Sequence, residues 1–215
     1  MIDFHTHTFN SDGELIASEL AARAAAAGYR ALAITDHVDE SNMEEVIEQT
    51  LRFTASYKGG RVKVVPGVEI THVAPEAIGP LAARARKLGA KIVVCHGETI
   101  VEPVEAGTNS AAIRAGVDIL AHPGLVSAED AVLAAKAGVY FEITSRKGHS
   151  LTNGHVAAAA RKHGVGLIVN TDTHSPGDLI TVDTARRVAI GANMTEEEFK
   201  IARKNAETLL EKILG

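Results

Sequence analysis

Seven short apolar runs alternate with longer stretches rich in Ala, Glu and Arg along this chain of 215 residues. The apolar runs are MIDF (1–4), ALAIT (31–35), RVKVVPGVEI (61–70), KIVVC (91–95), VDILA (117–121), VYFEIT (139–144) and GLIVN (166–170). They are nearly continuous in hydrophobicity, which is typical of parallel strands covered on both faces. Repeated strand-then-helix units predict a parallel sheet, either closed as a barrel or open and doubly wound.

Signals at helix ends support this reading. Stretches 14–28, 44–57, 75–89 and 195–214 have helical composition, and the last predicts a closing amphipathic helix at about 195–214. Glycines that would end helices lie at positions 28, 89, 116, 138 and 164. Ser41 with Glu44, and Thr195 with Glu198, have the spacing of capping boxes. No linker or charge block divides the chain, so we expect one domain over residues 1–215.

Histidines and carboxylates follow six of the seven predicted strands. The candidate metal ligands are His5, His7, Asp12, His37, Glu69, His96, His122, Asp172 and His174. In α/β barrels the loops after the strands converge on one face, which carries the active site. Side chains at i and i+2 on a strand point to one side, so His5 and His7 are expected to act together.

Imidazole beside carboxylate is the ligand chemistry of Zn, Mn or Fe. Nine such groups brought together without a cation would suffer uncompensated desolvation and repulsion. One catalytic zinc uses about three protein ligands, so nine ligands predict two to three divalent metal ions with at least one bridging carboxylate. No GxGxxG follows the first strand and no GxxxxGK[ST] is present, which weighs against the nucleotide-binding folds.

Other residues near these strand ends have predicted roles of a different kind. Arg146 follows the sixth strand and suits a phosphate, which an arginine can hold with two hydrogen bonds. Glu98 and Asn109 lie in a long polar segment after the fourth strand and are expected to contact substrate. The role of Glu142 is left open: it could be part of the cavity wall or a hydrogen-bond partner of a metal ligand. The role of His149 is also left open: it could be an ordinary loop residue or a contact to the substrate.

Bulk properties exclude several classes of partner. The formal net charge is −5 and no long Lys/Arg run is present, so no duplex nucleic acid is expected as a partner. No segment has the length and hydrophobicity of a membrane helix, and no signal peptide is evident. The single cysteine, Cys95, allows no internal disulfide and favours a cytoplasmic location. We expect Cys95 to face away from His96 and to be buried.

The motifs HTH (5–7), ITDH (34–37), GVEI (67–70), CHG (95–97), AHPG (121–124) and DTH (172–174) occur in an order that resembles the PHP (polymerase and histidinol phosphatase) family. The resemblance covers residues 2 to about 190. It implies a distorted (β/α)7 barrel and a metal-dependent phosphoesterase with up to three ions. It also implies that His5, His7, Glu69 and Asp172 hold one ion, that Glu69, His96 and His122 hold a second, and that Asp12, His37 and His174 hold a third.

The hypothesis is hydrolysis of a small phosphomonoester, histidinol-phosphatase-like, by a hydroxide held on the ions at His5, His7, Glu69 and Asp172. Asp36 is expected to orient a ligand imidazole from outside the metal shell. One alternative is a nuclease acting on single-stranded or very short nucleic acid. Another is a non-catalytic PHP module with a structural role, which the complete ligand set disfavours. The sequence makes no prediction of oligomeric state.

Overall fold

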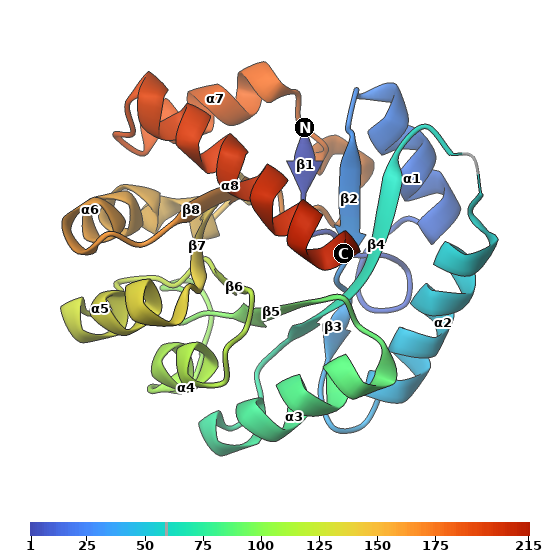
Figure 1. The fold of residues 1–215 in the computed structure, drawn as a ribbon, viewed down its shortest axis with the longest axis horizontal. Coiled ribbons are helices and arrows are strands. Elements are labelled where there is room, and N and C mark those ends of the chain that lie inside the picture. Colours follow the sequence, from blue (N-terminus) through green and yellow to red (C-terminus); the bar gives the residue numbers. More distant parts are fainter. Residues whose placement is uncertain (59) are drawn as a thin grey trace.

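Seven parallel strands form a sheet that is nearly closed into a barrel in the computed structural model, which describes residues 1–58 and 60–215 (Figure 1). The strands are β1 (Ile2–Asp3), β2 (Ala31–Ile34), β4 (Lys63–Ile70), β5 (Ile92–His96), β6 (Ile119–Ala121), β7 (Tyr140–Thr144) and β8 (Leu167–Asn170), in that spatial order. A parallel bridge between Thr6 and Thr173 joins the two edges just beyond β1 and β8. The predicted (β/α)7 barrel is confirmed, and the seven strands lie within the seven apolar runs except that β5 extends one residue further, to His96.

One additional short strand, β3 (His37–Val38), lies where the sequence predicted only the end of a strand. β4 pairs first with β2, from Ala31 opposite Lys63 to Ile34 opposite Pro66. Further along, β4 pairs with β3 and places His37 opposite Glu69. The chain therefore leaves the sheet for two residues and rejoins it, which brings two predicted ligands side by side.

Eight α-helices of the described chain surround the barrel, as Figure 1 shows. They are α1 (Ala17–Ala26), α2 (Met43–Ser56), α3 (Pro75–Leu88), α4 (Thr108–Arg114), α5 (Ala128–Ala137), α6 (Asn153–His163), α7 (Val182–Gly191) and α8 (Glu196–Leu214). Short 3-10 turns η1 (His149–Thr152) and η2 (Pro176–Asp178) precede α6 and α7. All five glycines predicted to end helices have positive φ, as that role requires. No helix among residues 1–58 and 60–215 is long and apolar enough to cross a membrane.

One of the two predicted capping boxes is confirmed and the other is wrong. Thr195 and Glu198 bond reciprocally at the start of α8. At α2 the cap position is Asn42, not Ser41. The reason is the nearby carboxylate of Asp39, which accepts hydrogen bonds from both the backbone N–H and the hydroxyl of Ser41 at 2.6 Å. The hydroxyl is therefore committed to the turn that precedes the helix.

The helix α8 closes the end of the barrel opposite the ligand-bearing loops. Ala206, Leu209 and Leu210 of α8 belong to the same buried cluster as Ile2 and Phe4 from the first strand region. In Figure 1 α8 crosses the viewer's end of the barrel beside the N-terminus. A second buried cluster lies between the sheet and the helices and includes Cys95, so the expected burial of that cysteine is confirmed. Apolar side chains thus fill the end of the barrel that α8 closes, which is called the lower end below. Polar side chains lie at the opposite, upper end.

The α8 cap predicts a measurable loss of stability on substitution. Thr195→Ala should lower the free energy of unfolding by about 1 kcal/mol, because the N–H of Glu198 loses its side-chain acceptor. Urea denaturation measures this change. The matched control is Thr208→Ala on the exposed face of the same helix, where removing a β-branched residue should not destabilise the helix. Equal loss in both variants would contradict the assignment of the cap.

Candidate metal centre

His5 and His7 lie side by side just after β1. Between them, Thr6 donates its hydroxyl hydrogen to the carbonyl oxygen of Ala33 at 2.6 Å and turns away from the cavity. The two imidazoles are fully buried, and their ring centroids are 5.1 Å apart. The i and i+2 spacing therefore directs both rings to the same side, as the sequence predicted.

The loop that carries Asp12 is shaped by Asp36. The Asp36 carboxylate accepts hydrogen bonds from the backbone and hydroxyl of Thr8, at 2.6 and 2.7 Å, and from the hydroxyl of Ser11 at 2.9 Å. A Cβ atom at Gly13 would lie 2.6 Å from the carbonyl oxygen of His7, so only glycine fits this turn. Asp36 was expected to orient an imidazole. Within the described residues its hydrogen bonds run to this loop instead, because the loop folds back over the end of β2.

Glu69 lies at the centre of the inner part of the site. Its Oε1 is 3.2 Å from Nε2 of His5, and its Oε2 is 3.5 Å from Nε2 of His7. Nε2 of His122 lies 3.8 Å from Oε1. Asp172 approaches the same imidazoles from the end of β8, with Oδ1 3.3 Å from Nε2 of His7. Glu69 thus lies within 4.0 Å of His5, His7 and His122, which the family resemblance divides between two ions, and its bridging role stays a prediction.

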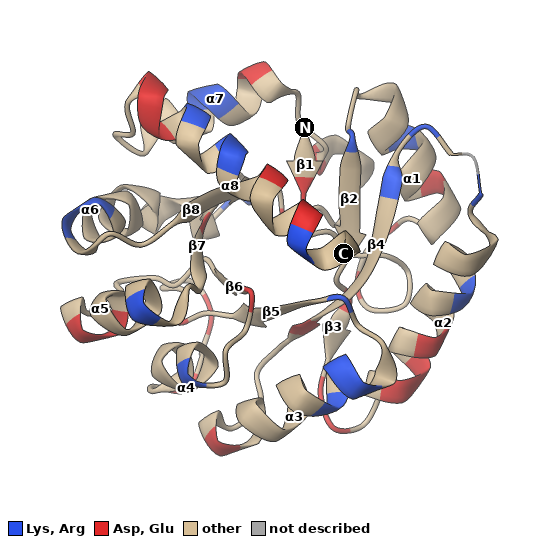
Figure 2. Cartoon of the chain, in the orientation of Figure 1, with Lys and Arg blue, Asp and Glu red and all other residues tan. Residues whose placement is uncertain are grey.

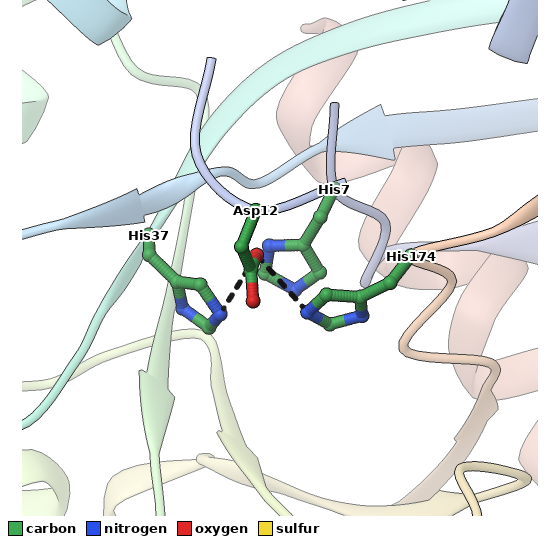
Figure 3. A group of neighbouring side chains, drawn as sticks. All are labelled: His7, Asp12, His37 and His174. Carbon is green, nitrogen blue, oxygen red and sulfur yellow. Dashed lines mark ion pairs between the residues drawn. The ribbon is translucent and has the colours of Figure 1, made fainter. Parts of the chain in front are cut away.

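A second group gathers at the edge of the cavity, as Figure 3 shows. His7, Asp12, His37 and His174 each offer a ligand atom, and these atoms all lie within 4.8 Å of one another. Oδ1 of Asp12 is 3.4 Å from Nε2 of His37 and 3.2 Å from Nε2 of His174. The three residues predicted for the third ion are brought together, with His7 as a neighbour that the prediction placed elsewhere.

His96 lies beside His122, one of its two predicted partners, with their ring centroids 4.5 Å apart, and it also contacts a residue that was not predicted. Its Nε2 is 3.0 Å from Oε2 of Glu102. Among the described residues, no ion pair within 4.0 Å joins His96 to Glu69. His149 lies close by, with its ring stacked 4.1 Å from that of His122. Sequence reasoning did not single out Glu102, although it lies in the polar loop that was expected to border the pocket.

Glu142, which sequence reasoning left open, is the hydrogen-bond partner of a predicted ligand. Its Oε1 accepts from Nδ1 of His5 at 2.8 Å and from the side-chain amide of Asn170 at 2.9 Å. Its Oε2 accepts from the backbone N–H of His122 at 3.2 Å. The carboxylate is fully buried and holds the proton of His5 on Nδ1, so the lone pair on Nε2 faces the cavity.

Three other imidazoles are oriented in the same way. Nδ1 of His96 donates to the carbonyl oxygen of Gly97 at 3.1 Å, and Nδ1 of His174 donates to that of Asp172 at 3.0 Å. Nδ1 of His37 lies 2.7 Å from the Thr71 hydroxyl oxygen, whose own hydrogen goes to the carbonyl oxygen of Glu69. Because carbonyl oxygens only accept, the rings of His96 and His174 carry a proton on Nδ1, and Nδ1 of His37 also lies 2.8 Å from an acceptor, Oε2 of Glu69.

Buried polar atoms without hydrogen bonds are concentrated here. In the described chain, eight buried side-chain nitrogen and oxygen atoms make none. One is the hydroxyl of Thr50, and the others belong to His5, His7, Glu69, His122 and Asp172. Orphaned buried polar atoms are rare in native proteins and need an explanation. Lone pairs of imidazole and carboxylate that face each other at 3.2 Å require a positive charge between them, so this donor set fits divalent metal ions.

The shifted pKa values of the buried side chains also reflect the need for positive charge at the site. Burial lowers the pKa of His5, but the carboxylates of Glu142, Glu69 and Asp172 outweigh it and raise the pKa well above its usual value. Burial, followed by the neighbouring imidazole of His37, holds the pKa of His7 well below its usual value. Burial raises the pKa of Asp172 to about 6. Protons and metal ions thus compete for one set of lone pairs.

Backbone strain also marks this end of the barrel. Four non-glycine residues of the described chain have positive φ, and three of them are at the site: His72 at 53°, His122 at 25° and Asp172 at 55°. Such conformations are costly for residues with a side chain and persist only where the surrounding structure imposes them. The sheet therefore fixes His122 and Asp172 in place at the expense of local backbone energy.

A cavity of about 340 Å³ opens above these groups. Arg146 lines it, with Nη1 3.2 Å from Oδ2 of Asp178 and Nε 4.0 Å from Oδ2 of Asp172. Glu98 and Asn109 do not line it. The Glu98 side chain accepts from the backbone of Gly107 and Asn109, while the Asn109 side chain accepts from the backbone of Glu98. Both side chains pin the loop that carries Glu102, and substrate contact by either stays a prediction.

Two curated relatives align with almost the whole chain. An uncharacterized protein of Methanocaldococcus jannaschii is 50% identical over 201 residues, which is 92% of this chain and 92% of the relative. A protein of Caldanaerobacter subterraneus subsp. tengcongensis named as a probable phosphatase is 30% identical over 226 residues, covering 92% of this chain and 85% of that protein.

Solved structures share the fold at low identity. A chain in the cryo-EM structure of archaeal ribonuclease P with mature tRNA has a TM-score of 0.70 at 18% identity, covering 99% of this chain and 91% of that chain. The histidinol phosphate phosphatase of Lactococcus lactis subsp. lactis, complexed with zinc, L-histidinol and phosphate, has a TM-score of 0.65 at 15% identity, covering 90% and 94%. The PHP domain model matches residues 3–136, more than half of the sequence. The chain therefore belongs to the PHP domain family.

Proposed function

We propose that the chain is a metal-dependent phosphoesterase that hydrolyses a small phosphomonoester. The observation that supports this proposal is the fully buried group in which Nε2 of His5 and His7 faces the carboxylates of Glu69 and Asp172, while Glu142 accepts the Nδ1 proton of His5. Divalent ions held there would supply an activated water and neutralise the phosphoryl oxygens. The named probable phosphatase, at 30% identity, supports the reaction class.

Within this proposal, the residues divide into two kinds. His5, His7, Glu69 and Asp172 hold the ion nearest the reaction, and Glu142 keeps His5 in the tautomer that can bind it. Arg146 pairs with Asp178 through Nη1 and lines the cavity, where its guanidinium would hold a phosphate oxygen. Zinc, manganese and iron all suit this donor set. Zinc is the ion present in the Lactococcus lactis enzyme.

The shape and charge of the cavity favour a small monoester over a nucleic acid strand. A volume of about 340 Å³ is at the low end for small-molecule pockets. Among the residues of the described chain that line it, Arg146 alone is a lysine or arginine, while Asp12, Asp39, Glu102 and Asp172 are acidic. A strand-binding groove needs cations along its length. Figure 2 shows acidic and basic residues interspersed over the surrounding helices.

Metal removal tests the reaction class directly. Dialysis against a strong chelator should abolish hydrolysis of phosphomonoesters, and reloading with Zn, Mn or Fe should restore it. Asp172→Ala should lower kcat/KM by several orders of magnitude, because the inner ion loses a ligand, and its circular dichroism should match that of wild type. A panel of phosphomonoesters and short oligonucleotides measures the preference. Full activity after complete metal removal would refute the proposal.

Glu142 tests the tautomer argument. Glu142→Ala should weaken zinc binding about 10- to 100-fold, because nothing then holds the His5 proton on Nδ1. Competition against a chelating dye measures the affinity. The exposed glutamate Glu211 is a suitable control, and Glu211→Ala should bind zinc like wild type. Unchanged affinity in Glu142→Ala would show that the hydrogen bond to His5 has no bearing on metal binding.

Arg146 and its neighbour Lys147 form a matched pair. Arg146→Ala should raise KM for a phosphomonoester roughly tenfold or more, since a charged hydrogen bond contributes about 1.5–3 kcal/mol. Lys147→Ala, an exposed position that does not line the described cavity, should leave KM unchanged. Steady-state kinetics on the two variants shows whether Arg146 itself or general positive charge binds the phosphate. Equal effects would assign the phosphate contact to general positive charge rather than to Arg146.

A further inference from the structure

We propose that the alcohol released from the phosphomonoester is uncharged and apolar, and that four exposed hydrophobic side chains beside the cavity hold it. These side chains are Ile100, Val101, Leu125 and Leu151, and we call them the rim patch. The proposal deepens the proposed function and rests on it, because it assumes that a phosphomonoester is hydrolysed in the cavity. It names the chemical class of the alcohol that the ester carries.

Exposed apolar side chains are concentrated at the end of the barrel that carries the cavity. Ten large hydrophobic residues of the described chain are exposed, and the other four lie on the helices α5, α7 and α8. Six lie between a strand and the helix that follows it: Phe9, Ile16, Ile100, Val101, Leu125 and Leu151. Single exposed hydrophobic residues need no explanation, but a group of them beside a cavity indicates a binding surface.

Val101 and Leu151 come from different loops but lie at one place on the surface. The Val101 side chain packs on Gly148, where an added Cβ atom would lie 3.6 Å from Cγ2 of Val101. The carbonyl oxygen of Gly148 accepts a hydrogen bond from the backbone N–H of Leu151 at 3.1 Å. One glycine thus joins the two residues, and its positive φ of 94° suits a residue without a side chain.

Leu125 and Ile100 are brought together in a similar way. A Cβ atom at Gly124 would lie 3.3 Å from Cα of Thr99, so the two loops are in close contact. Leu125 directly follows Gly124, and Ile100 directly follows Thr99. Thr99 also contacts the third loop, since its hydroxyl oxygen is 2.8 Å from Nδ1 of His149. The rim patch is therefore one surface built from three adjoining loops.

The rim patch is continuous with the cavity. Glu102, which lines the cavity, directly follows Val101, and His149, which also lines it, belongs to the same 3-10 turn as Leu151. Among the described residues that line the cavity, Val38 alone is aliphatic. Small-molecule sites are lined mostly by apolar side chains, with a few polar groups that orient the ligand. The cavity thus suits the phosphate, and the rim patch supplies the apolar contact that the rest of the ester needs.

Charge and size decide which occupant suits the rim patch. Residues 97–107, between β5 and α4, include Glu98, Glu102 and Glu105 and no lysine or arginine. This negative charge disfavours a second phosphate, a nucleic acid strand and an anionic membrane surface. A stable protein interface uses roughly 20–30 residues on each side, far more than the rim patch contains. An uncharged apolar group attached to the phosphate is the occupant that these features favour.

A series of unbranched alkyl phosphates, from ethyl to octyl phosphate, tests the proposal on the metal-loaded protein. The leaving alcohols have nearly the same acidity, so a change in kcat/KM along the series reports binding of the alkyl chain. For wild type, kcat/KM should rise roughly two- to fourfold for each methylene that reaches the rim patch. The double variant Leu125→Ser Leu151→Ser should lower the octyl-to-ethyl ratio of kcat/KM at least about tenfold. Both leucines are 67% or more exposed, so the variant should keep the wild-type circular dichroism spectrum.

Matched controls make the result specific. Ile190→Ser on α7 and Ile201→Ser on α8 change exposed isoleucines that do not line the cavity, and both should keep the wild-type ratio. A wild-type kcat/KM that does not rise with chain length overturns the proposal and leaves the proposed function standing. A rise that the double variant keeps in full does the same.

Two further outcomes separate the remaining possibilities. If sedimentation shows a wild-type dimer that the double variant dissociates, the rim patch binds a second copy of the chain and the proposal is wrong. If metal-loaded wild type hydrolyses none of the esters, the proposed function fails and the rim-patch proposal fails with it.

Discussion

The arrangement of the barrel depends on one buried interaction at its ligand-bearing end. There, nitrogen lone pairs of imidazoles face oxygen lone pairs of carboxylates. His5 and Glu69 are fully buried, and their nearest nitrogen and oxygen atoms are 3.2 Å apart. The proton of His5 is on Nδ1, on the far side of the ring, and is donated to the carboxylate of Glu142. An uncompensated group of this kind would cost several kcal/mol for each buried charge. A cation between these atoms would compensate that cost, and the donor set fits one.

The two ends of the barrel differ in the side chains they contain and in their effect on stability. At the lower end, α8 adds Ala206, Leu209 and Leu210 to the apolar cluster inside the strands. At the other end, side chains inside the barrel become imidazoles and carboxylates, and the backbone adopts positive φ at His122 and Asp172. Apolar packing is favourable wherever it forms, so the lower end supplies stability that offsets the strain and desolvation at the upper end.

Strand ends could be predicted from the sequence because their geometry is local. An apolar run predicts a strand, and residues at or just after its end lie at the carboxyl end of the sheet, so the places of His5, Glu69 and Asp172 could be predicted from position. Loop residues do not obey such a rule. The partners of Glu102 are fixed by the path of an eleven-residue loop from Gly97 to Gly107, which Glu98 and Asn109 hold in place. The same limit applies to Asp36, whose partners depend on how the Thr8–Ser11 turn folds back.

The division between strand-borne and loop-borne ligands has a consequence for how ions would be held. Glu69 lies within β4 and is paired on both sides, by His37 of β3 and Val94 of β5. Its backbone is therefore held by two neighbouring strands. Asp12 and Glu102 lie on loops, and their side chains are 58% and 38% exposed. Rigid and buried ligands bind ions tightly because little ordering remains to be done on binding, whereas exposed loop ligands must be ordered at that moment. Under the proposed function, an ion at the buried strand-borne ligands would therefore be held more tightly than an ion that depends on the exposed loop carboxylates.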